Sequence, residues 1–283
     1  MALVKRPLNI TRFQSNDSIM MQAPTKTATE TIASKTITSE TITSGTRVGH
    51  RDNAIAQVRP KDAATLIVVR GGPEPTILMG KRAATHRFMP NKFVFPGGKL
   101  DRVDQQLQVP GELSDPVMTR LRKSTRKDVG DRKLRGLALA AIRETYEETG
   151  LVIGRKAVSP LRSRNSIWQE YFAHDVEPPL EHMDFIARAI TPPNPNRRFD
   201  TRFFMVHDRF IQNDPERVVD ASGELNEIHW IALSKARQLD LPSITRWIID
   251  RVEERIRFDT SAQLEQSAPF IRFINGAQVS ADL

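Results

Sequence analysis

Residues 143–151 read Arg-Glu-Thr-Tyr-Glu-Glu-Thr-Gly-Leu, and this stretch decides the fold prediction. It closes a run of strong helix formers that begins at Leu137, and its glycine is placed to end a helix. On such a helix Glu144, Glu147 and Glu148 stand at positions i, i+3 and i+4, so their carboxylates share one face. Because like charges this close repel, a hard divalent cation would stabilise them. The alternative is a solvated acidic face, which is common on helices.

A second stretch, residues 93–101, lies upstream and reads Phe-Val-Phe-Pro-Gly-Gly-Lys-Leu-Asp. It has the pattern of a short apolar strand that ends in a Pro-Gly-Gly turn, where the backbone can approach a ligand closely. Such a turn next to an acidic helix would bring a backbone carbonyl and carboxylates to one metal–phosphate site. Arg143 lies four residues before Glu147 and can hold its side chain by a charge-assisted hydrogen bond.

Together these residues resemble the Nudix box, whose pattern is G-x5-E-x7-R-E-U-x-E-E-x-G-U. Gly98 and Asp104 keep the first spacing, with Asp in place of Glu, and residues 143–151 match the second half except for Thr145 at an aliphatic position. The two halves are farther apart than in the family: 38 residues separate Asp104 from Arg143, which amounts to an insertion of 31 residues. Whether Asp104 replaces the box glutamate is left open.

The resemblance implies an α/β fold, namely an α/β/α sandwich with a mixed β-sheet. It also implies a hydrolase that needs Mg²⁺ or Mn²⁺ and cleaves a diphosphate bond in a nucleoside diphosphate linked to another moiety. Substrates of the coenzyme A type, ADP-ribose and dinucleotides all remain open. The metal ligands that it implies are Glu144, Glu147, Glu148 and the carbonyl of Gly98.

One glutamate would position or deprotonate the attacking water. Glu144 and Glu147 are candidates on the helix, and Arg143 would orient them. Glu224 follows a Ser-Gly turn at a place where Nudix sites often gain one more carboxylate, and Glu227 is the second choice there.

Basic residues on either side of the box are candidate substrate contacts. Arg82 and Arg87 lie in a segment that resembles the one preceding the box in coenzyme A diphosphatases, and either could bind a phosphate. Arg197, Arg198 and Asp200 belong to an Arg-Arg-Phe-Asp-Thr segment that resembles the same branch and would contact the substrate. Solvated cations at the first site and a structural Arg–Asp pair at the second are the alternatives.

Composition narrows the function classes. The 283 residues include no cysteine, which excludes disulfides, thiolate metal sites and a cysteine nucleophile. The formal charge of +8 and the pI of about 10.0 favour polyanionic partners, with a small-molecule nucleotide first and nucleic acid as an alternative. No apolar run approaches the roughly 18–20 residues of a membrane span, so we expect a soluble, cytoplasmic protein. The basic start of the chain leaves organelle targeting as an alternative.

The sequence divides into three segments. Residues 1–58 are a Thr/Ser-rich leader that we expect to be disordered, 59–258 form the Nudix domain, and 259–283 form a C-terminal tail. The tail holds an apolar patch, 270–274, that would cap the domain, add a strand or serve a homodimer. Residues 105–135 are a basic insertion without a convincing apolar period, which predicts a solvated loop, with a mobile flap or a nucleic-acid patch as alternatives.

Elsewhere in the domain, an apolar run at 63–70 predicts a buried strand, and the Gly-Gly-Pro turn after it predicts a hairpin with a return strand at 75–82. Helical spacing predicts helices at 234–237 and 243–258, with Trp247 in the core. The main alternative to the hydrolase is a catalytically inactive Nudix-fold protein that binds a nucleotide or RNA through the basic insertion.

Overall fold

The structure is a computed structural model. It describes residues 58–85, 90–123, 125–193, 197–214, 216, 225–274 and 277–283. Apart from its last residue, the predicted leader therefore lies outside the described residues.

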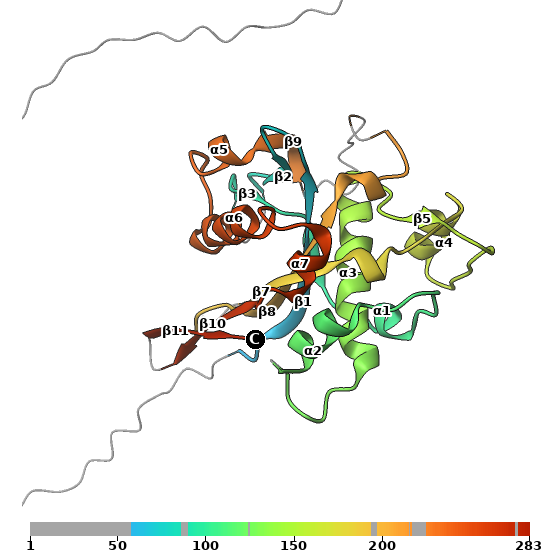
Figure 1. The fold of residues 1–283 in the computed structure, drawn as a ribbon, viewed down its shortest axis with the longest axis horizontal. Helices are drawn as coiled ribbons and strands as arrows, with labels where there is room; N and C mark the ends of the chain where they lie inside the picture. The colour runs from blue at the N-terminus through green and yellow to red at the C-terminus, as the bar shows by residue number, and fades with distance from the viewer. Residues whose placement is uncertain are drawn as a thin grey trace, which may run out of the picture. The chain divides into compact units, whose positions relative to one another are not determined.

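A nine-stranded mixed sheet forms the centre of the described part of the chain (Figure 1). The order is β11-β10-β7-β8-β1-β2-β3, with β4 also paired to β1 and β9 to β2. The pairs β1–β8 and β7–β10 are parallel, the others are antiparallel, and the predicted β1–β2 hairpin is confirmed. The strands are β1 (Lys61–Arg70), β2 (Thr76–Arg82), β3 (Phe93–Val94), β4 (Gly97–Lys99), β7 (Asp184–Ile190), β8 (Phe199–His207), β9 (Leu225–Ala232), β10 (Pro269–Ile274) and β11 (Ala277–Asp282), while β5 (Arg155–Lys156) and β6 (Val176–Glu177) form a separate pair.

Helices cover both faces of this sheet (Figure 1). α1 (Arg102–Gln106), α2 (Asp115–Lys123), α3 (Asp131–Thr149) and α4 (Ser166–Phe172) lie on one side, and α5 (Leu233–Ala236) and α6 (Ser243–Arg255) lie on the other. α7 (Thr260–Glu265) and two short 3₁₀ turns, Leu180–His182 and Asp208–Phe210, complete the described elements. Within the described ranges, no helix combines the length and the apolar character that crossing a membrane would need.

Alternation along the central strand β1 builds the two cores. Leu66 and Val68 pack into a cluster with residues of α3, whereas Ile67 and Val69 pack into a cluster with residues of α6. Successive side chains of a strand point to opposite faces, so one strand supplies both layers. The predicted α/β/α sandwich with a mixed sheet is thereby confirmed.

The prediction of a solvated loop over residues 105–135 is wrong for much of that segment. α2 occupies Asp115–Lys123, and α3 already begins at Asp131. Val117 and Leu121 of α2 are fully buried in the core on the α3 side. Their spacing of four residues is a helical one, but the many Arg and Lys residues around them obscured the apolar face.

A buried ion-pair cluster fastens α2 to the rest of the domain. Arg120 donates to Asp184 of β7 at 2.7 Å and also to the carbonyl of Leu264, while Arg255 of α6 pairs with the same aspartate at 3.2 Å. All three charged side chains are about 95% buried. The segment that contains α2 is therefore part of the packed domain.

The apolar patch at 270–274 adds a strand, which is one of the three alternatives that the sequence left open. In the parallel pair of β10 with β7, Phe270 lies opposite Arg188 and Ile271 opposite Ala189, and β11 then returns antiparallel to β10. The sheet thus extends past residue 258, where the domain was expected to end.

Candidate active site

The acidic helix α3 ends where the glycine signal predicts. Gly150 adopts the left-handed conformation, with φ of 69°, and its N–H donates to the carbonyl of Tyr146 at 2.8 Å. Glycine adopts this conformation without the steric cost that other residues meet. The last turn of α3 therefore holds Glu144, Glu147 and Glu148 just before the chain turns away.

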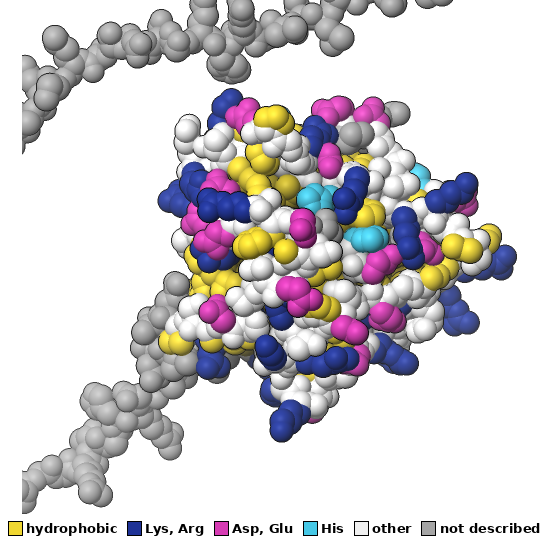
Figure 2. All heavy atoms as spheres, viewed as in Figure 1, with side chains coloured by type: hydrophobic (Ala, Val, Ile, Leu, Met, Phe, Trp, Pro, Cys, Tyr) yellow, Lys and Arg dark blue, Asp and Glu magenta, His cyan; other side chains and the backbone are white. Residues whose placement is uncertain are grey.

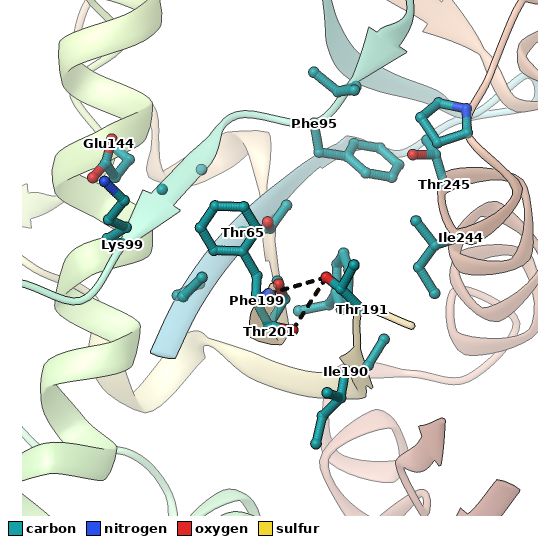
Figure 3. A pocket seen from close by; sticks show the side chains of 18 of the residues that line it. Thr65, Phe95, Lys99, Glu144, Ile190, Thr191, Phe199, Thr201, Ile244 and Thr245 are labelled. Carbon is teal, nitrogen blue, oxygen red and sulfur yellow. Dashed lines mark hydrogen bonds between the residues drawn. The ribbon is translucent and has the colours of Figure 1, made fainter. Parts of the chain in front are cut away.

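Two glycines of β4 lie directly against these carboxylates. A Cβ atom built on Gly98 would overlap the carboxylate of Glu144, so the missing side chain is what allows the two to meet. The N–H of Gly97 donates to Oε2 of Glu148 at 3.0 Å. Figure 3 shows Glu144 projecting from α3 toward β4, next to Lys99. Strand and helix thus bring backbone and carboxylate groups together, as the Pro-Gly-Gly turn predicted.

Arg143 organises the carboxylates of α3. Its Nη1 lies 3.0 Å from Oε1 of Glu144 and 3.1 Å from Oε2 of Glu147, the pair that the four-residue spacing predicts. Its Nη2 donates to the carbonyl of Lys99 at 3.1 Å. Burial alone would lower the pKa of Arg143, but the hydrogen bonds and charge of Asp104 raise the pKa well above its ordinary value. Arg143 is therefore a fixed positive charge.

Asp104 is the buried anchor of that guanidinium. It accepts from Nε and Nη2 of Arg143, both at 2.9 Å, and it also accepts from Nε1 of Trp168 at 3.2 Å and from the N–H of Asp101 at 3.0 Å. Its side chain is completely buried, and it is not among the described residues that line the nearby cavity. Asp104 therefore anchors Arg143.

Close packing of α1 on α3 brings the segment around Asp104 next to the end of α3. A Cβ atom on Gly136 of α3 would lie 3.0 Å from the Cα of Gln105 in α1, so glycine permits the close approach of the helices. The chain between them leaves through α2 and returns at Asp131. Asp104 and Arg143, which are far apart in the sequence, thereby become neighbours.

Burial changes the acid–base character of the glutamates. It raises the pKa of Glu144 to about 7, against the opposing effect of Arg143. It also raises the pKa of Glu147, which Arg143 again opposes. A carboxylate that loses solvation in this way gains from a nearby cation, and carboxylate and carbonyl oxygens are the donors that Mg²⁺ and Mn²⁺ prefer.

The donor set thus fits a hard divalent cation in its chemistry, although its oxygens are engaged by the protein itself. Among the described residues, no three acidic or histidine side chains converge on one point. Glu148 accepts from Gly97, and Glu144 and Glu147 pair with Arg143. A bound cation would have to take over part of these interactions.

The carboxylates stand at one end of a cavity of about 760 Å³. Its floor comes from one face of β1 and β8, and its far end comes from the start of α6 and from β10 (Figure 3). The acidic end is lined by Gly98, Lys99, Arg143, Glu144 and Glu147, the floor by Ala63, Thr65, Phe199 and Thr201, and the far end by Ile244, Thr245, Trp247, Ile271 and Phe273.

The predicted substrate residues divide into two groups. Arg82 and Arg197 line the cavity. Arg198 instead donates to the carbonyl of Thr191 at 3.2 Å, and Asp200 accepts from Nε of Arg188 at 2.7 Å, so the structural Arg–Asp pair is present. Neither Arg198 nor Asp200 is among the described lining residues.

Three predicted site residues remain, namely Arg87, Glu224 and Glu227. Arg87 and Glu224 lie outside the described residues. Glu227 is exposed on β9, where its carboxylate lies 3.3 Å from Nζ of Lys81. It is not among the described residues that line the cavity.

Sequence reasoning missed the far wall of the cavity. Trp247 packs against the core cluster on the α6 side, as expected, but it is only half-buried and also lines the cavity. The guanidinium of Arg251 lies 5.7 Å from its ring. The signals were weak: Phe199, Thr201 and Phe203 alternate along β8, and Pro242 precedes a helix start. Nothing in the sequence alone linked these segments to the acidic helix.

Comparisons with known proteins agree with this fold. The chain is 26% identical over 167 residues to putative nudix hydrolase 7 of Caenorhabditis elegans, an alignment that covers 55% of this chain and 46% of that protein. The chain thus spans about half the length of this relative. It is also similar to the crystal structure of a NUDIX hydrolase from Alicyclobacillus acidocaldarius, with 26% identity, a TM-score of 0.50, and coverage of 69% of this chain and 91% of the other.

A more distant likeness is to the NUDIX domain of Shewanella oneidensis NrtR in complex with ADP ribose. The identity is 12% and the TM-score 0.41, with 73% of this chain and 94% of the other covered. No protein-family model matches the chain. The predicted Nudix fold is confirmed by the Alicyclobacillus structure together with the mixed sheet described above.

Proposed function

We propose that this member of the Nudix hydrolase superfamily hydrolyses a diphosphate bond in a nucleoside diphosphate linked to another moiety. A coenzyme A-type compound, ADP-ribose or a dinucleotide would each offer such a bond. The observation that carries the proposal is the contact between Glu144 and the side-chain-free Gly98 at the end of a large cavity. A helix that served stability alone would gain nothing from a desolvated glutamate there.

The residues that would hold Mg²⁺ or Mn²⁺ are Glu144, Glu147 and Glu148, with the carbonyl of Gly98. When bound, the metal would supply charge neutralisation for the diphosphate and a more acidic water.

Side chains around the cavity would transfer the proton, position the carboxylates and contact the phosphate. Glu144, with its pKa raised to about 7, can accept a proton near neutral pH, and Glu147 is the second candidate. Arg143 holds both carboxylates in place. Lys99 and Arg82 line the cavity and would contact phosphate oxygens, and a guanidinium can do so through two parallel hydrogen bonds.

The size and lining of the cavity suit a substrate with two dissimilar parts. Ligand sites commonly measure about 300–1,000 Å³ and combine apolar walls with a few polar groups. Here the carboxylates stand at the α3 end, while the aromatic side chains of Phe199, Trp247 and Phe273 line other parts of the cavity. The diphosphate would lie at the acidic end, and an attached organic group would lie against the aromatic wall.

The alternative function, binding of nucleic acid through the basic insertion, has less support. Arg120 and Arg135 of that segment are buried, the first against Asp184 and the second against the carbonyls of Leu107 and Val109. Arg122 forms a two-bond pair with Asp131. On the face shown in Figure 2, acidic and basic side chains are interspersed. A nucleic-acid site instead favours a continuous basic surface.

The test is nucleotide or phosphate release from a panel of coenzyme A, acyl-coenzyme A, ADP-ribose, NADH and diadenosine polyphosphates. Each compound is assayed with Mg²⁺ and with Mn²⁺, using the wild type and Glu147→Gln. We expect the wild type to cleave at least one compound and the variant to lose that cleavage. Glu265→Gln is the matched control, because Glu265 is exposed on α7 and is not a described lining residue of the cavity.

Two outcomes of this assay would contradict the proposal. A folded wild type that cleaves nothing with either metal would contradict the hydrolase and favour the binding protein. Equal activity of Glu147→Gln and wild type would contradict the role of the α3 carboxylates.

A further inference from the structure

Helix α6 begins inside the cavity with its N-terminus uncapped. The helix runs over 13 residues from Ser243, and Pro242 before it provides no side-chain cap. Its first turn contains no acidic residue. Because the first N–H groups of a helix have no partner within the helix, an uncapped start is a favourable place for an anion. Ser243, Ile244 and Thr245 all line the cavity.

Thr245 gives a second, independent indication of a ligand at this end. Thr245 is 94% buried, and no hydrogen bond is formed by its hydroxyl among the described residues. Figure 3 shows the hydroxyl turned toward the cavity beside Phe95. A ligand oxygen that met this hydroxyl would accept a hydrogen bond from it in a largely desolvated place, where such a bond is strengthened.

The two ends of the cavity lie on opposite sides of its floor. In Figure 3, Glu144 stands on the α3 side and Thr245 on the α6 side, with Thr65 and Phe199 between them. The surroundings of Thr245 are apolar, including Phe95 and Ile244. Electrostatic attraction between a helix N-terminus and an anion is strengthened where water is scarce.

We propose that the N-terminus of α6, with the hydroxyl of Thr245, is a metal-free subsite for a second oxyanion of the ligand, either a phosphate or a carboxylate. The ligand would then span the cavity, with its diphosphate at Glu144 and the second oxyanion at Thr245. This inference rests on the proposed function, to which it adds one feature of the substrate, namely a second oxyanion. The binding that defines the subsite can be measured without any turnover.

The test compares ligands that differ by one charged group. Calorimetric titration of the full chain without added metal would use NADPH against NADH, coenzyme A against dephospho-coenzyme A, and succinyl- against butyryl-coenzyme A. The first two pairs test a phosphate, and the third tests a carboxylate. We expect the member with the extra oxyanion to bind about tenfold more tightly in at least one pair, as one additional charged hydrogen bond would give.

Two variants test whether α6 causes that preference. Thr245→Val removes the hydroxyl with little change of shape and should reduce the preference several-fold. Ser243→Asp places a carboxylate at the uncapped helix start, where it should abolish the preference and raise the melting temperature. A mainly structural role of this helix end would not give weaker binding together with higher stability.

Thr76→Val is the matched control. The hydroxyl of Thr76 is buried without a hydrogen-bond partner among the described residues, but it lies on β2 and outside the described lining of the cavity. The control should keep the wild-type preference. The proposal is overturned by equal affinities within every pair, or by a preference that Thr245→Val and Ser243→Asp leave unchanged. Because no turnover is measured, failure of the hydrolase assay would leave this result intact.

Discussion

Asp104 and Arg143 lie 39 positions apart in the chain and meet in a buried two-bond ion pair, with both N–O distances at 2.9 Å. The pair connects α1 to the acidic helix α3 and fixes the guanidinium that holds Glu144 and Glu147. The aspartate therefore links the packing of α1 to the geometry of the candidate site.

The family-typical glutamate should not fit at position 104. Asp104 is fully buried and in contact with Trp168. We expect Asp104→Glu to lower the free energy of unfolding by about 1–3 kcal/mol, because an extra methylene must be accommodated in a packed interior. Asp104→Asn should cost about 3–5 kcal/mol, since it leaves Arg143 without its main buried counter-ion. Urea denaturation measures both.

The same two variants give a kinetic prediction. Asp104 is not among the described lining residues of the cavity, so both variants should lower kcat while changing KM little. An increase in KM with unchanged kcat would contradict the positioning role of this aspartate.

Gly98→Ala should damage the site and leave the fold nearly intact. The new Cβ would overlap the carboxylate of Glu144, which is the movable end of a side chain and can swing away. We expect turnover to fall about a hundredfold, as displaced catalytic groups can cause, with a small change in melting temperature. Gly130→Ala is the control, because a Cβ there meets nothing within 4 Å and the φ of −75° suits alanine. Equal activity of the two variants would contradict the proposed fit between Gly98 and Glu144.

Metal binding should strengthen as pH rises toward neutrality. Burial raises the pKa of Glu144 from an ordinary 4.5 to about 7 in the metal-free protein, so between these values the folded chain holds a proton that the unfolded chain releases. The contribution of Glu144 to the free energy of unfolding therefore decreases with rising pH across that window. A cation must displace this proton.

The measurement is the rise in melting temperature on adding Mg²⁺ or Mn²⁺ at a series of pH values. It should grow from pH 5 to about pH 7 and then level off. Glu144→Gln should remove most of this dependence. A rise that does not change with pH in the wild type would contradict the assignment of Glu144 as a metal ligand.

Asp184→Asn should be among the most destabilising single changes outside the site. It leaves Arg120 and Arg255 buried without their common carboxylate, at a cost of about 3–5 kcal/mol. Asp250→Asn is the control, because Asp250 and its partner Arg237 are both exposed. Surface ion pairs of this kind contribute about 0–1 kcal/mol. Similar losses in the two variants would show that burial does not distinguish these ion pairs.

Local spacing in the sequence predicted the acidic half of the site well. The positions of Glu144 and Glu147 relative to Arg143 follow from helix geometry, and the close approach of Gly98 to Glu144 follows from the absence of a side chain. These relationships extend over a few residues or depend on one residue type, so they can be recognised without a structure.

The rest of the cavity depends on contacts that the sequence does not encode locally. Thr245 and Phe273 line the cavity only because α6 and β10 come to lie beside it in the folded chain. The choice between Arg197 and Arg198 depends on which side of the chain faces the cavity at the start of β8. Helix α2 was missed because its apolar residues are few and are surrounded by cations.

The pairing of β10 with β7 has a practical consequence for making shorter versions of this protein. β7 is almost entirely buried, and β10 covers its outer edge. A fragment that stopped at residue 258 would expose the unpaired N–H and C=O groups of an apolar strand to solvent. Such edges recruit strands from other molecules, so the fragment should aggregate.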